Sequence, residues 1–581
     1  MTEKRWILPQ EEDTTIEKIQ VLSNILATNN VPLNTIIAQL LVQRNVTDFD
    51  AAKSFFRPQL SDLHNPFLMQ DMDKAVARVE EALTQHQKIM VYGDYDVDGT
   101  TAVALVYAFL KEEGADVTYE IPNRYIDGYG IAYRVIDKAA AAGVDLMIAL
   151  DCGIKAVEKI DYAAGKGIDF IVCDHHLPDK EIPRAAAVLD PQRLDCNYPY
   201  KGLSGCGVGF KLLQAYCQKN NVPFERLEAM LDLVVVSIAS DLVPITGENR
   251  VLAHYGLQRL NTSPRKGLQS IIDISVLNNQ TITISDIVFR LGPRLNAAGR
   301  MDTGATSVDL LLAESDELAK IIGKTVNTQN NHRKNLDRSI TVEAIAAVRR
   351  EPAWHNKHSI VAFNPDWHKG VLGIVASRLV EEFYRPSVVL TVSNGVATGS
   401  ARSIAGFDLY SAIESCSDLL TNFGGHLYAA GLTMPVDNVA KFSERFERIA
   451  QKKLLPQMLI PQINVDAKIE FTDITEQFCR ILKQFQPFGP DNMAPVFVTH
   501  KVFCNGNIRT VGSTAEHLKM ELMQEKFSSH TMSAIGFDFS DFYSYIAGGN
   551  PIDICYSIEE NTFQGKTTLQ LQIKDIKKSA S

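Results

Sequence analysis

The segment KIMVYGDYDVDGTT, residues 88–101, decides the predicted fold of residues 71–250. Its first part, residues 88–92, is a short apolar run of the kind that forms a buried strand. An apolar-periodic helix is predicted for residues 100–113, and three carboxylates lie between the strand and this helix: Asp94, Asp96 and Asp98. This order predicts one β-α unit with a cluster of negative charge at the carboxyl end of its strand.

The alternation of strands and helices continues downstream of this segment. Helices are predicted at residues 131–142 and 155–166, and strands at residues 116–121, 144–150 and 168–173 and from Val188 onward. Strands that alternate with helices predict a parallel sheet covered on both faces, so the expected fold class is α/β.

The chain has 581 residues, too many for a single core, so several domains are expected. The segment near residues 305–350 is strongly helical, and five short β-prone runs between about residues 465 and 577 suggest a small β-barrel of the OB type. The predicted domains are an N-terminal helical cap (1–70), an α/β domain with the acidic motifs (71–250), a helical connector (251–350), a second α/β domain (351–455) and the β-barrel (456–581).

Composition is that of an ordinary globular protein, with 45% apolar and 22% charged residues. The N-terminus lacks the apolar core of a signal peptide, and no apolar run approaches the ~18 residues that span a bilayer, so we expect a cytoplasmic protein without a membrane partner. Nine scattered cysteines without a C-x-x-C pair indicate reduced thiols. The net charge of −11 argues mildly against a nucleic-acid partner, but it does not exclude a local basic channel.

Carboxylates and histidines follow three of the predicted strands at the point where each strand ends. These residues are Asp94, Asp96 and Asp98 in GDYDVDGTT, Asp151 in LDCG, and Asp174, His175 and His176 in CDHHLP. Because the carboxyl ends of parallel strands share one edge of a sheet, the side chains should converge there. So many carboxylates repel one another unless cations neutralise them, and oxygen ligands with one or two imidazoles suit Mn²⁺ or Mg²⁺. Two ions ~3.5–4 Å apart suit the cleavage of a phosphodiester.

Each motif also has a simpler interpretation. A D-x-D-x-D loop can bind calcium, Asp-Gly is a common turn, and a His-His pair is usually a surface or capping feature. A calcium loop of the EF-hand type, however, lies between helices and needs a Glu at its twelfth position, whereas here a strand precedes the loop. Three acidic motifs at successive strand ends therefore favour the metal site.

The motifs resemble a known family. GDYDVDGTT, LDCG and CDHHLP look like the signature blocks of the DHH phosphoesterases, and SIASDLVPI supplies Asp241 as the late aspartate of that pattern. In the second half, RLGPRLNAAGRM, WHKGVLGIVASRL, GSARS and FGGHLYAAG look like the later motifs of the RecJ branch. The resemblance covers about residues 70–575. It implies a DHH domain, a helical connector, a DHH-associated domain and an OB fold.

The resemblance also implies the roles of the acidic residues. The metal ligands would be Asp94, Asp96, Asp98, Asp151, His175 and Asp241. Which of the first three aspartates bind directly stays open. His176 would contact the substrate or orient the water, so these seven residues together form the implied catalytic set.

Several residues resemble the substrate-binding part of the RecJ pattern. Arg124, Ser400 and Arg402 look like the pocket for a 5′ phosphate, because a guanidinium binds phosphate in a bidentate manner. Further residues could line the channel for the DNA strand or could instead hold the connector: Arg290, Arg294, Asn296, Arg300, His368 and Lys369. The triplet Gly424, Gly425 and His426 could let backbone amides approach a phosphate, or it could simply be a turn. Base-stacking candidates on the barrel are Phe497, Phe503, Phe537 and Phe539.

The implied activity is 5′-to-3′ exonuclease action on single-stranded DNA with two Mn²⁺ or Mg²⁺ ions, in DNA recombination and repair. The resemblance to the family is the only ground for expecting a single-stranded-DNA-binding protein and a RecQ-like helicase as partners. The protein is expected to be a monomer. Two alternatives stay open. One is a DHH-type oligonucleotide or cyclic-dinucleotide phosphodiesterase, and the other is a non-catalytic DNA-binding scaffold.

Overall fold

The computed structural model describes residues 4–9, 13–28, 31, 34–124, 126–278, 280–301, 303–351, 354–524, 530–563 and 566–579. The chain divides into two compact units. One is Leu63–Pro461, and the other combines Met1–Asp62 with Gln462–Ser581.

A parallel five-stranded sheet forms the centre of the first lobe of the larger unit. Its strand order is β3-β2-β4-β5-β6, and all neighbouring pairs are parallel. The strands are β2 (Lys88–Gly93), β3 (Asp116–Glu120), β4 (Leu146–Leu150), β5 (Asp169–Cys173) and β6 (Ala187–Leu189). Every residue of β4 is buried, as expected for a strand covered on both faces. The α/β prediction is confirmed.

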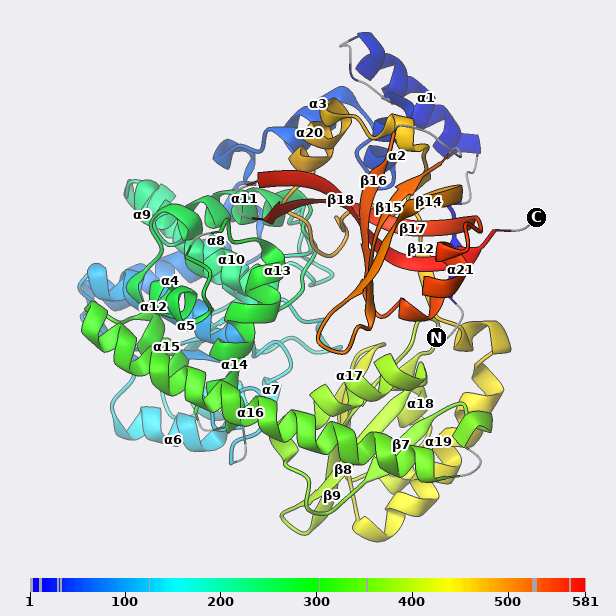
Figure 1. Ribbon diagram of the computed structural model, residues 1–581. Coiled ribbons are helices and arrows are strands. Elements are labelled where there is room, and N and C mark those ends of the chain that lie inside the picture. Colours follow the sequence, from blue (N-terminus) through cyan, green and yellow to red (C-terminus); the bar gives the residue numbers. More distant parts are fainter. Residues whose placement is uncertain are drawn as a thin grey trace. The chain divides into compact units, whose positions relative to one another are not determined.

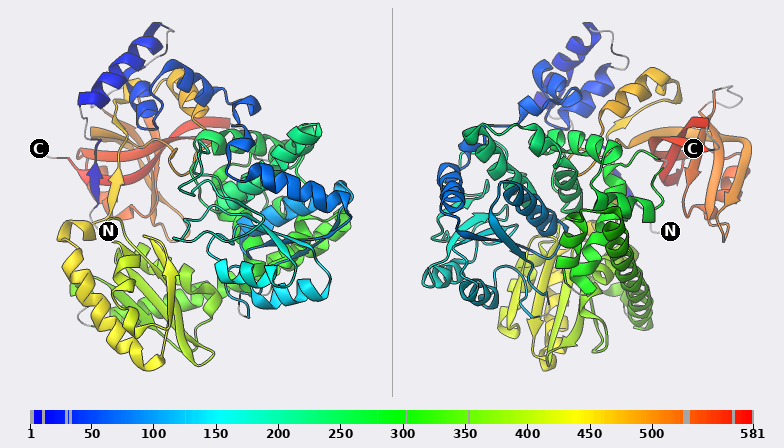
Figure 2. Two further views of the ribbon diagram at one scale, coloured as in Figure 1. Left: turned by 180° about the vertical axis from the view of Figure 1, so that it is seen from behind. Right: turned by 90° about the vertical axis from the view of Figure 1, so that its left-hand side faces the viewer.

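Helices cover both faces of this sheet (Figure 2). The side chains of α6 (Tyr133–Ala141) and α7 (Val157–Ala164) share one apolar core with Met90 and Phe170 of the sheet. On the other face, α5 (Val97–Glu112) and α8 (Gly205–Asn220) pack against β2 and β4 and against each other. The remaining helices of this lobe are α4 (Met72–Thr84), α9 (Glu225–Glu228), α10 (Leu231–Ser240) and α11 (Gly247–Thr262).

Helix α5 begins three residues earlier than the pattern predicts. Asp96 is the N-cap, because its Oδ1 accepts a hydrogen bond from the amide of Gly99 at 3.1 Å. Asp98 therefore lies in the first turn of the helix and not in the preceding loop.

The connector contains a helix of 35 residues, α16 (Asp316–Arg350). Figure 1 shows α16 running past both lobes of the larger unit. One half packs on α12, α14 and α15, and the other half packs on α17 and β7. The shorter connector elements are α12 (Lys266–Ile274), α13 (Ile284–Asp286), a π-helical turn (Ile287–Leu291), α14 (Gly292–Met301) and α15 (Ala305–Leu311).

The second lobe of the larger unit contains a mixed sheet of order β10-β11-β9-β8-β7, in which only β7 and β8 pair in parallel. The strands are β7 (Ile360–Phe363), β8 (Ser387–Ser393), β9 (Val396–Arg402), β10 (Asn422–Gly425) and β11 (Ala429–Met434). The helices are α17 (Leu372–Phe383), α18 (Leu409–Glu414) and α19 (Val439–Lys453).

The smaller unit is a β-barrel with helices packed on it. Its sheet has the order β13-β14-β15-β16-β18-β17, and the added pairing of β14 with β17 closes it. The strands are β13 (Ala467–Lys468), β14 (Phe497–Val511), β15 (His517–Met523), β16 (Met532–Gly536), β17 (Ile552–Phe563) and β18 (Lys566–Lys578). The five predicted β runs are therefore the strands β14 to β18.

The N-terminal helices share a core with this barrel. Leu41 and Phe55 belong to the same apolar cluster as Phe497 and Tyr556. The other elements of this unit are α1 (Asp13–Thr28), α2 (Asn34–Val42), α3 (Phe49–Phe56), α20 (Glu476–Gln484), α21 (Tyr543–Ala547) and the strand pair β1 (Arg5–Ile7) with β12 (Gln462–Asn464).

Two of the predicted base-stacking residues are excluded by burial. The rings of Phe497 and Phe539 are 0% and 4% exposed and belong to the barrel core, so neither can stack on a nucleobase. Phe503 is half-buried, whereas Phe537 is 46% exposed and packs edge-on against His517. Among the described residues, no helix combines the length and the apolar character needed to cross a membrane.

Candidate metal centre

Three loops meet at the carboxyl edge of the parallel sheet. Asp94 follows β2, Asp151 follows β4, and the Asp174–His176 segment follows β5, and these strands are direct neighbours. Asp241 joins them from the end of α10. The structure thus gathers all seven residues predicted as catalytic in one cluster. They form overlapping groups that could each hold an ion: Asp94, Asp96 and Asp151; Asp98, His175 and Asp241; and Asp151, His175 and His176.

His175 lies in the middle of the cluster. Its Nε2 atom is 3.2 Å from Oδ1 of Asp151, 3.6 Å from Oδ2 of Asp241 and 3.7 Å from Oδ2 of Asp98. One imidazole nitrogen cannot satisfy three carboxylates, so this spacing suits side chains that point at a common ion.

The backbone around Asp151 is held in an unusual conformation. Asp151 has a φ of +57°, a region that non-glycine residues rarely adopt and that often occurs at functional sites. Its amide donates to the carbonyl of Cys173 at 2.9 Å. A Cβ at Gly205 would lie 2.5 Å from the Cβ of Asp151, so the start of α8 needs glycine to approach this loop.

Asp98 is fixed by the protein itself. Its carboxylate accepts hydrogen bonds from the amides of Gly205 and Cys206 at 2.6 and 2.8 Å and from the hydroxyl of Ser237 at 2.6 Å. Three donors leave Asp98 less free to coordinate an ion than Asp94, which has a buried Oδ1 without a described hydrogen-bond partner. These anchoring residues were not among the predicted site residues, although the glycine-rich segment SGCGVG marks a close approach of the backbone.

His176 forms a separate charged pair with Asp174. Its Nδ1 lies 2.7 Å from Oδ1 of Asp174, whose oxygens also accept from the amides of Ile154 and His175. Although burial opposes both shifts, this pairing lowers the pKa of Asp174 to about 2 and raises the pKa of His176 to about 9. The hydroxyl of Tyr129 lies 3.3 Å from Nε2 of His176. His176 is therefore oriented from both ring nitrogens.

The electrostatics of the cluster fit divalent cations. Burial raises the pKa of Asp94, Asp98, Asp151 and Asp241, and the neighbouring carboxylates raise it further. Asp94 and Asp151 are only 2% and 3% exposed. Oδ1 of Asp94 and Nε2 of His175 are buried without a hydrogen-bond partner among the described residues. Buried acceptors of this kind are tenable when a cation replaces the missing donors.

The second lobe contributes an anion pocket at the start of α17. The guanidinium of Arg402 donates to Oγ of Ser400 at 3.1 Å, and both side chains lie against Gly373 in the first turn of α17. A Cβ at Gly373 would lie 2.9 Å from Nη2 of Arg402 and 3.1 Å from Oγ of Ser400. A helix N-terminus, a hydroxyl and a guanidinium together form a site suited to a phosphate group.

Two more arginines lie close to this pocket. The guanidinium of Arg124 stacks over the ring of Tyr95 at 4.1 Å, and Nη1 of Arg300 donates to the carbonyl of Gly370 at 3.3 Å. Burial and the charges of Arg124, Arg333 and Arg402 lower the pKa of Arg300 to about 9. Three neighbouring guanidiniums therefore act electrostatically on Arg300, and the carboxylate of Asp96 opposes them. Burial and the charge of Arg124 also lower the pKa of Lys369.

Several of the other predicted substrate-binding residues make contacts within the protein itself. Arg290 lies 3.8 Å from Asp286 of the same turn, and Arg294 donates to Asn327 of α16 at 3.1 Å, so both also hold the connector. Gly424 and Gly425 belong to β10, and the amide of His426 donates to Ala429 at 2.7 Å within the hairpin. That amide is therefore already engaged, and the imidazole is the part of His426 that faces the site.

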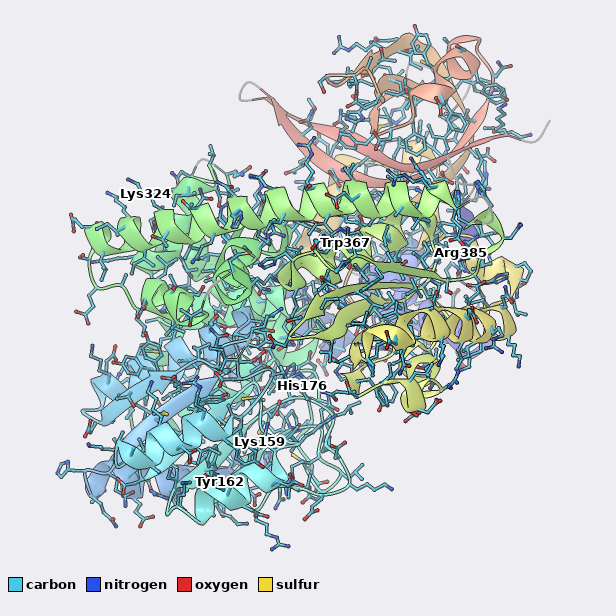
Figure 3. The ribbon with its side chains drawn as sticks, turned by 90° about the horizontal axis from the view of Figure 1, so that it is seen from below. Lys159, Tyr162, His176, Lys324, Trp367 and Arg385 are labelled. Atoms are coloured by element: carbon cyan, nitrogen blue, oxygen red, sulfur yellow. The ribbon has the colours of Figure 1, made fainter. Side chains whose placement is uncertain are left out.

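His426 links the two lobes at the cluster. Its ring stacks over the ring of His176 with 6.4 Å between the centroids. In Figure 3, His176 lies where the loops of the first lobe meet the second. Burial and the charges of His176, Lys155 and His175 lower the pKa of His426, so the ring is kept neutral beside a charged one.

Models of three known domains match consecutive parts of the chain. The DHH family, N-terminal domain, matches residues 88–238, the DHHA1 domain matches residues 356–452, and the RecJ OB domain matches residues 465–575. The fold and the site thus define a DHH-type protein with an added OB domain.

Several similar proteins are described as RecJ exonucleases. A single-stranded-DNA-specific exonuclease RecJ from Bacillus subtilis is 35% identical over 94% of this chain and 68% of its own length. Its Escherichia coli counterpart is 31% identical over 87% of this chain and 90% of its own length. A crystal structure of RecJ in complex with Mn²⁺ from Thermus thermophilus matches 99% of this chain and 80% of its own, with 26% identity and a TM-score of 0.83. The chain belongs to the RecJ family of single-stranded-DNA-specific exonucleases.

Proposed function

We propose that this protein is a divalent-metal-dependent exonuclease that degrades single-stranded DNA from the 5′ end. The observation that carries the proposal is the convergence of seven acidic and imidazole side chains at one sheet edge. The RecJ relatives are single-stranded-DNA-specific exonucleases, and the fold of this chain matches a RecJ structure that contains Mn²⁺.

The donor set fits two Mn²⁺ or Mg²⁺ ions. Asp94, Asp96 and Asp151 form one group around the first position, and His175 and Asp241 form a second group with Asp98 beside it. Bound at these positions, the ions would activate a water molecule and stabilise the leaving oxygen of a phosphodiester. Asp151 belongs to two of the candidate groups, so it is the residue that can connect the two positions.

His176 has a different role in this proposal. Asp174 accepts the hydrogen bond of Nδ1 and fixes the ring, and Nε2 lies 3.3 Å from the hydroxyl of Tyr129, which a substrate oxygen would replace as its partner. A positively charged imidazole at this position can donate to a non-bridging oxygen of the scissile phosphate, where negative charge develops during cleavage.

The pocket at Ser400 and Arg402 gives the enzyme its polarity. A 5′ phosphate bound against the first turn of α17, with Arg124 as a further donor, would place the first phosphodiester at the acidic cluster. A 3′ end carries no terminal phosphate of this kind, so it would lack this anchor. The guanidinium of Arg300, which lies close enough to Arg124 and Arg402 for their charges to act on it, would add to the positive potential that attracts the phosphates that follow.

The same proposal includes the predicted domains: cap 1–70, DHH domain 71–250, connector 251–350, DHH-associated domain 351–455 and OB domain 456–581. On the barrel, the exposed ring of Phe537 supports base stacking. We propose a cytoplasmic location, since its substrate is DNA, and a monomeric state. Through the family we also propose a single-stranded-DNA-binding protein and a RecQ-like helicase as partners.

The proposal is tested by digestion of end-labelled DNA. The protein should release labelled mononucleotides at once from a 5′-labelled single strand, and it should leave the same sequence intact as a duplex. A 3′ label should be released late, and chelation should stop the reaction. Rapid release of dinucleotide products only, or a preference for short oligonucleotides over long strands, would support the phosphodiesterase alternative instead.

A further inference from the structure

The carboxylate of Asp98 lies at the N-terminus of helix α8. The first two amides of the helix, those of Gly205 and Cys206, donate to it directly at 2.6 and 2.8 Å. The third amide, that of Gly207, donates at 3.1 Å to Oγ of Ser204, which is the N-cap residue. A helix N-terminus stabilises a negative charge, so the start of α8 stabilises the carboxylate of Asp98.

Two serine hydroxyls connect this N-cap to the same carboxylate. Oγ of Ser237 in α10 donates to Oδ1 of Asp98 at 2.6 Å, and Oγ of Ser204 lies 2.6 Å from Oγ of Ser237. A hydroxyl has one proton to donate, and Ser237 donates its proton to Asp98, so Ser204 must donate to Ser237. The hydrogen bonds therefore run in one direction, from the amide of Gly207 through both serines to Asp98. Both serines are 0% exposed.

These donors determine which oxygen of Asp98 remains available. A carboxylate has about four acceptor positions, two on each oxygen. Oδ1 accepts from Ser237 and from Cys206, so both of its positions are used. Oδ2 accepts from Gly205 and lies 3.7 Å from Nε2 of His175. The described hydrogen bonds thus leave one position, on Oδ2, and this oxygen faces the metal centre.

We propose that Ser237 and Ser204 are positioning residues of the metal centre, which fix Asp98 so that it offers Oδ2 alone to the second cation. The proposal rests on the proposed function, in which the second cation lies against His175 and Asp241. Both serines would act through Asp98, because they prevent its carboxylate from turning or from binding in a bidentate manner. Hydrogen-bond partners of metal ligands typically contribute about 10–100-fold to metal affinity.

The test measures Mn²⁺ binding and Mn²⁺-dependent activity in the full-length protein. Calorimetric titration gives the number of bound ions and their affinities, and the rate of nucleotide release is measured over a range of Mn²⁺ concentrations. Ser237→Ala removes the last donor of the chain. Ser307→Ala is the matched control, because Ser307 is also 0% exposed and its hydroxyl donates to the carbonyl of Leu295 at 2.7 Å.

In Ser237→Ala, one of the two Mn²⁺ affinities should fall about tenfold, and the Mn²⁺ concentration for half-maximal activity should rise by the same factor. The rate at saturating Mn²⁺ should stay close to that of the wild type, since the ion then occupies its position despite the weaker affinity. Ser307→Ala should lower the melting temperature to a similar extent and leave both affinities unchanged. Unchanged affinities in Ser237→Ala would overturn the proposal.

A second variant tests the connection between the two serines. Ser204→Ala should also weaken Mn²⁺ binding, and the double variant should lose less affinity than the two single losses combined, because Ser204 acts through Ser237. Fully additive losses would contradict the chain of hydrogen bonds. If Ser237→Ala does not fold, the Mn²⁺ affinities of Ser204→Ala decide: a weakened one supports the proposal, and unchanged ones overturn it.

The wild type separates this proposal from the proposed function. If the wild type binds no Mn²⁺ and releases no nucleotide, the proposed function itself fails. If the wild type binds two ions and both serine variants bind them equally well, only the positioning role of the serines is lost.

Discussion

Nε2 of His175 and Oδ1 of Asp151 lie 3.2 Å apart, although the two residues follow different strands of the sheet. The pairing of β4 with β5 brings the two strand ends together, and the left-handed backbone of Asp151 turns its carboxylate toward the imidazole. This contact is the centre of the account, because Asp151 also belongs to the group formed with Asp94 and Asp96.

Replacing Asp151 by Asn should remove activity and keep the fold. Asn has nearly the same size as Asp and tolerates a positive φ, but it lacks the charge that holds two cations. We expect the rate of nucleotide release to fall by a factor on the order of 10³ or more, comparable to the loss of a major transition-state contact. Calorimetric titration with Mn²⁺ should show fewer bound ions. Retention of both ions and of activity would exclude Asp151 as a shared ligand.

The stability of the metal-free protein should fall as the pH rises. Asp94, Asp98, Asp151 and Asp241 have a raised pKa in the folded state, whereas a carboxyl of the unfolded chain titrates near about 3.9. Above about pH 4 the folded state therefore holds more protons than the unfolded state, and stability decreases with pH until these groups ionise. Saturating Mn²⁺ should reverse this trend, because ions replace the protons.

The measurement is the melting temperature between pH 5 and pH 8, with chelator and with Mn²⁺. In chelator, Asp151→Asn should show a smaller decrease than the wild type, since it has one fewer carboxyl to ionise. A wild-type melting temperature that rises with pH in chelator would contradict the raised pKa values proposed for these carboxyl groups.

Asp174→Asn should separate the orientation of His176 from metal binding. The variant loses the charge that pairs with Nδ1, so the pKa of His176 should fall from about 9 toward its ordinary value. The turnover rate should fall roughly 10–100-fold, as is typical for a residue that orients an active-site histidine, with the number of bound ions unchanged. NMR titration of the His176 ring in the metal-free protein checks this. A pKa that stays near 9 would show that Asp174 is not its cause.

Arg402→Ala and Gly373→Ala should weaken the preference for a 5′-phosphorylated end. The first removes the guanidinium, and the second adds a methyl group 2.9 Å from Nη2 of Arg402, which the flexible arginine can avoid only by leaving its position. We expect the ratio of kcat/KM for phosphorylated over unphosphorylated ends to fall about tenfold in each. Activity on unphosphorylated ends serves as the internal control. An unchanged ratio in Arg402→Ala would move the 5′ phosphate elsewhere.

The sheet and the acidic cluster were predictable from sequence for a physical reason. Apolar runs such as residues 146–150 mark strands buried on both faces, and the polar residue that follows each run must lie at the shared edge. The start of α5 was missed because Asp96 is both a candidate ligand and an N-cap, and its capping role became visible only in the hydrogen bond to Gly99.

The anion pocket and the barrel surface depend on tertiary packing. Nothing near Gly373 or Arg333 in the sequence shows that one lies against Arg402 and the other lines a cavity with Ser240. The phenylalanines of the barrel have similar local patterns, yet closure of the sheet buries Phe497 and leaves Phe537 exposed. The exposure and the neighbours of such residues are set only once distant parts of the chain have packed together.

The most direct test of the account is anomalous diffraction from crystals of the protein soaked in Mn²⁺. We predict two manganese peaks about 3.5–4 Å apart. One should lie among Asp94, Asp96 and Asp151, and the other should lie against His175 and Asp241. A cluster without a peak, or with manganese bound only elsewhere on the chain, would contradict the central claim that these side chains form the catalytic metal centre.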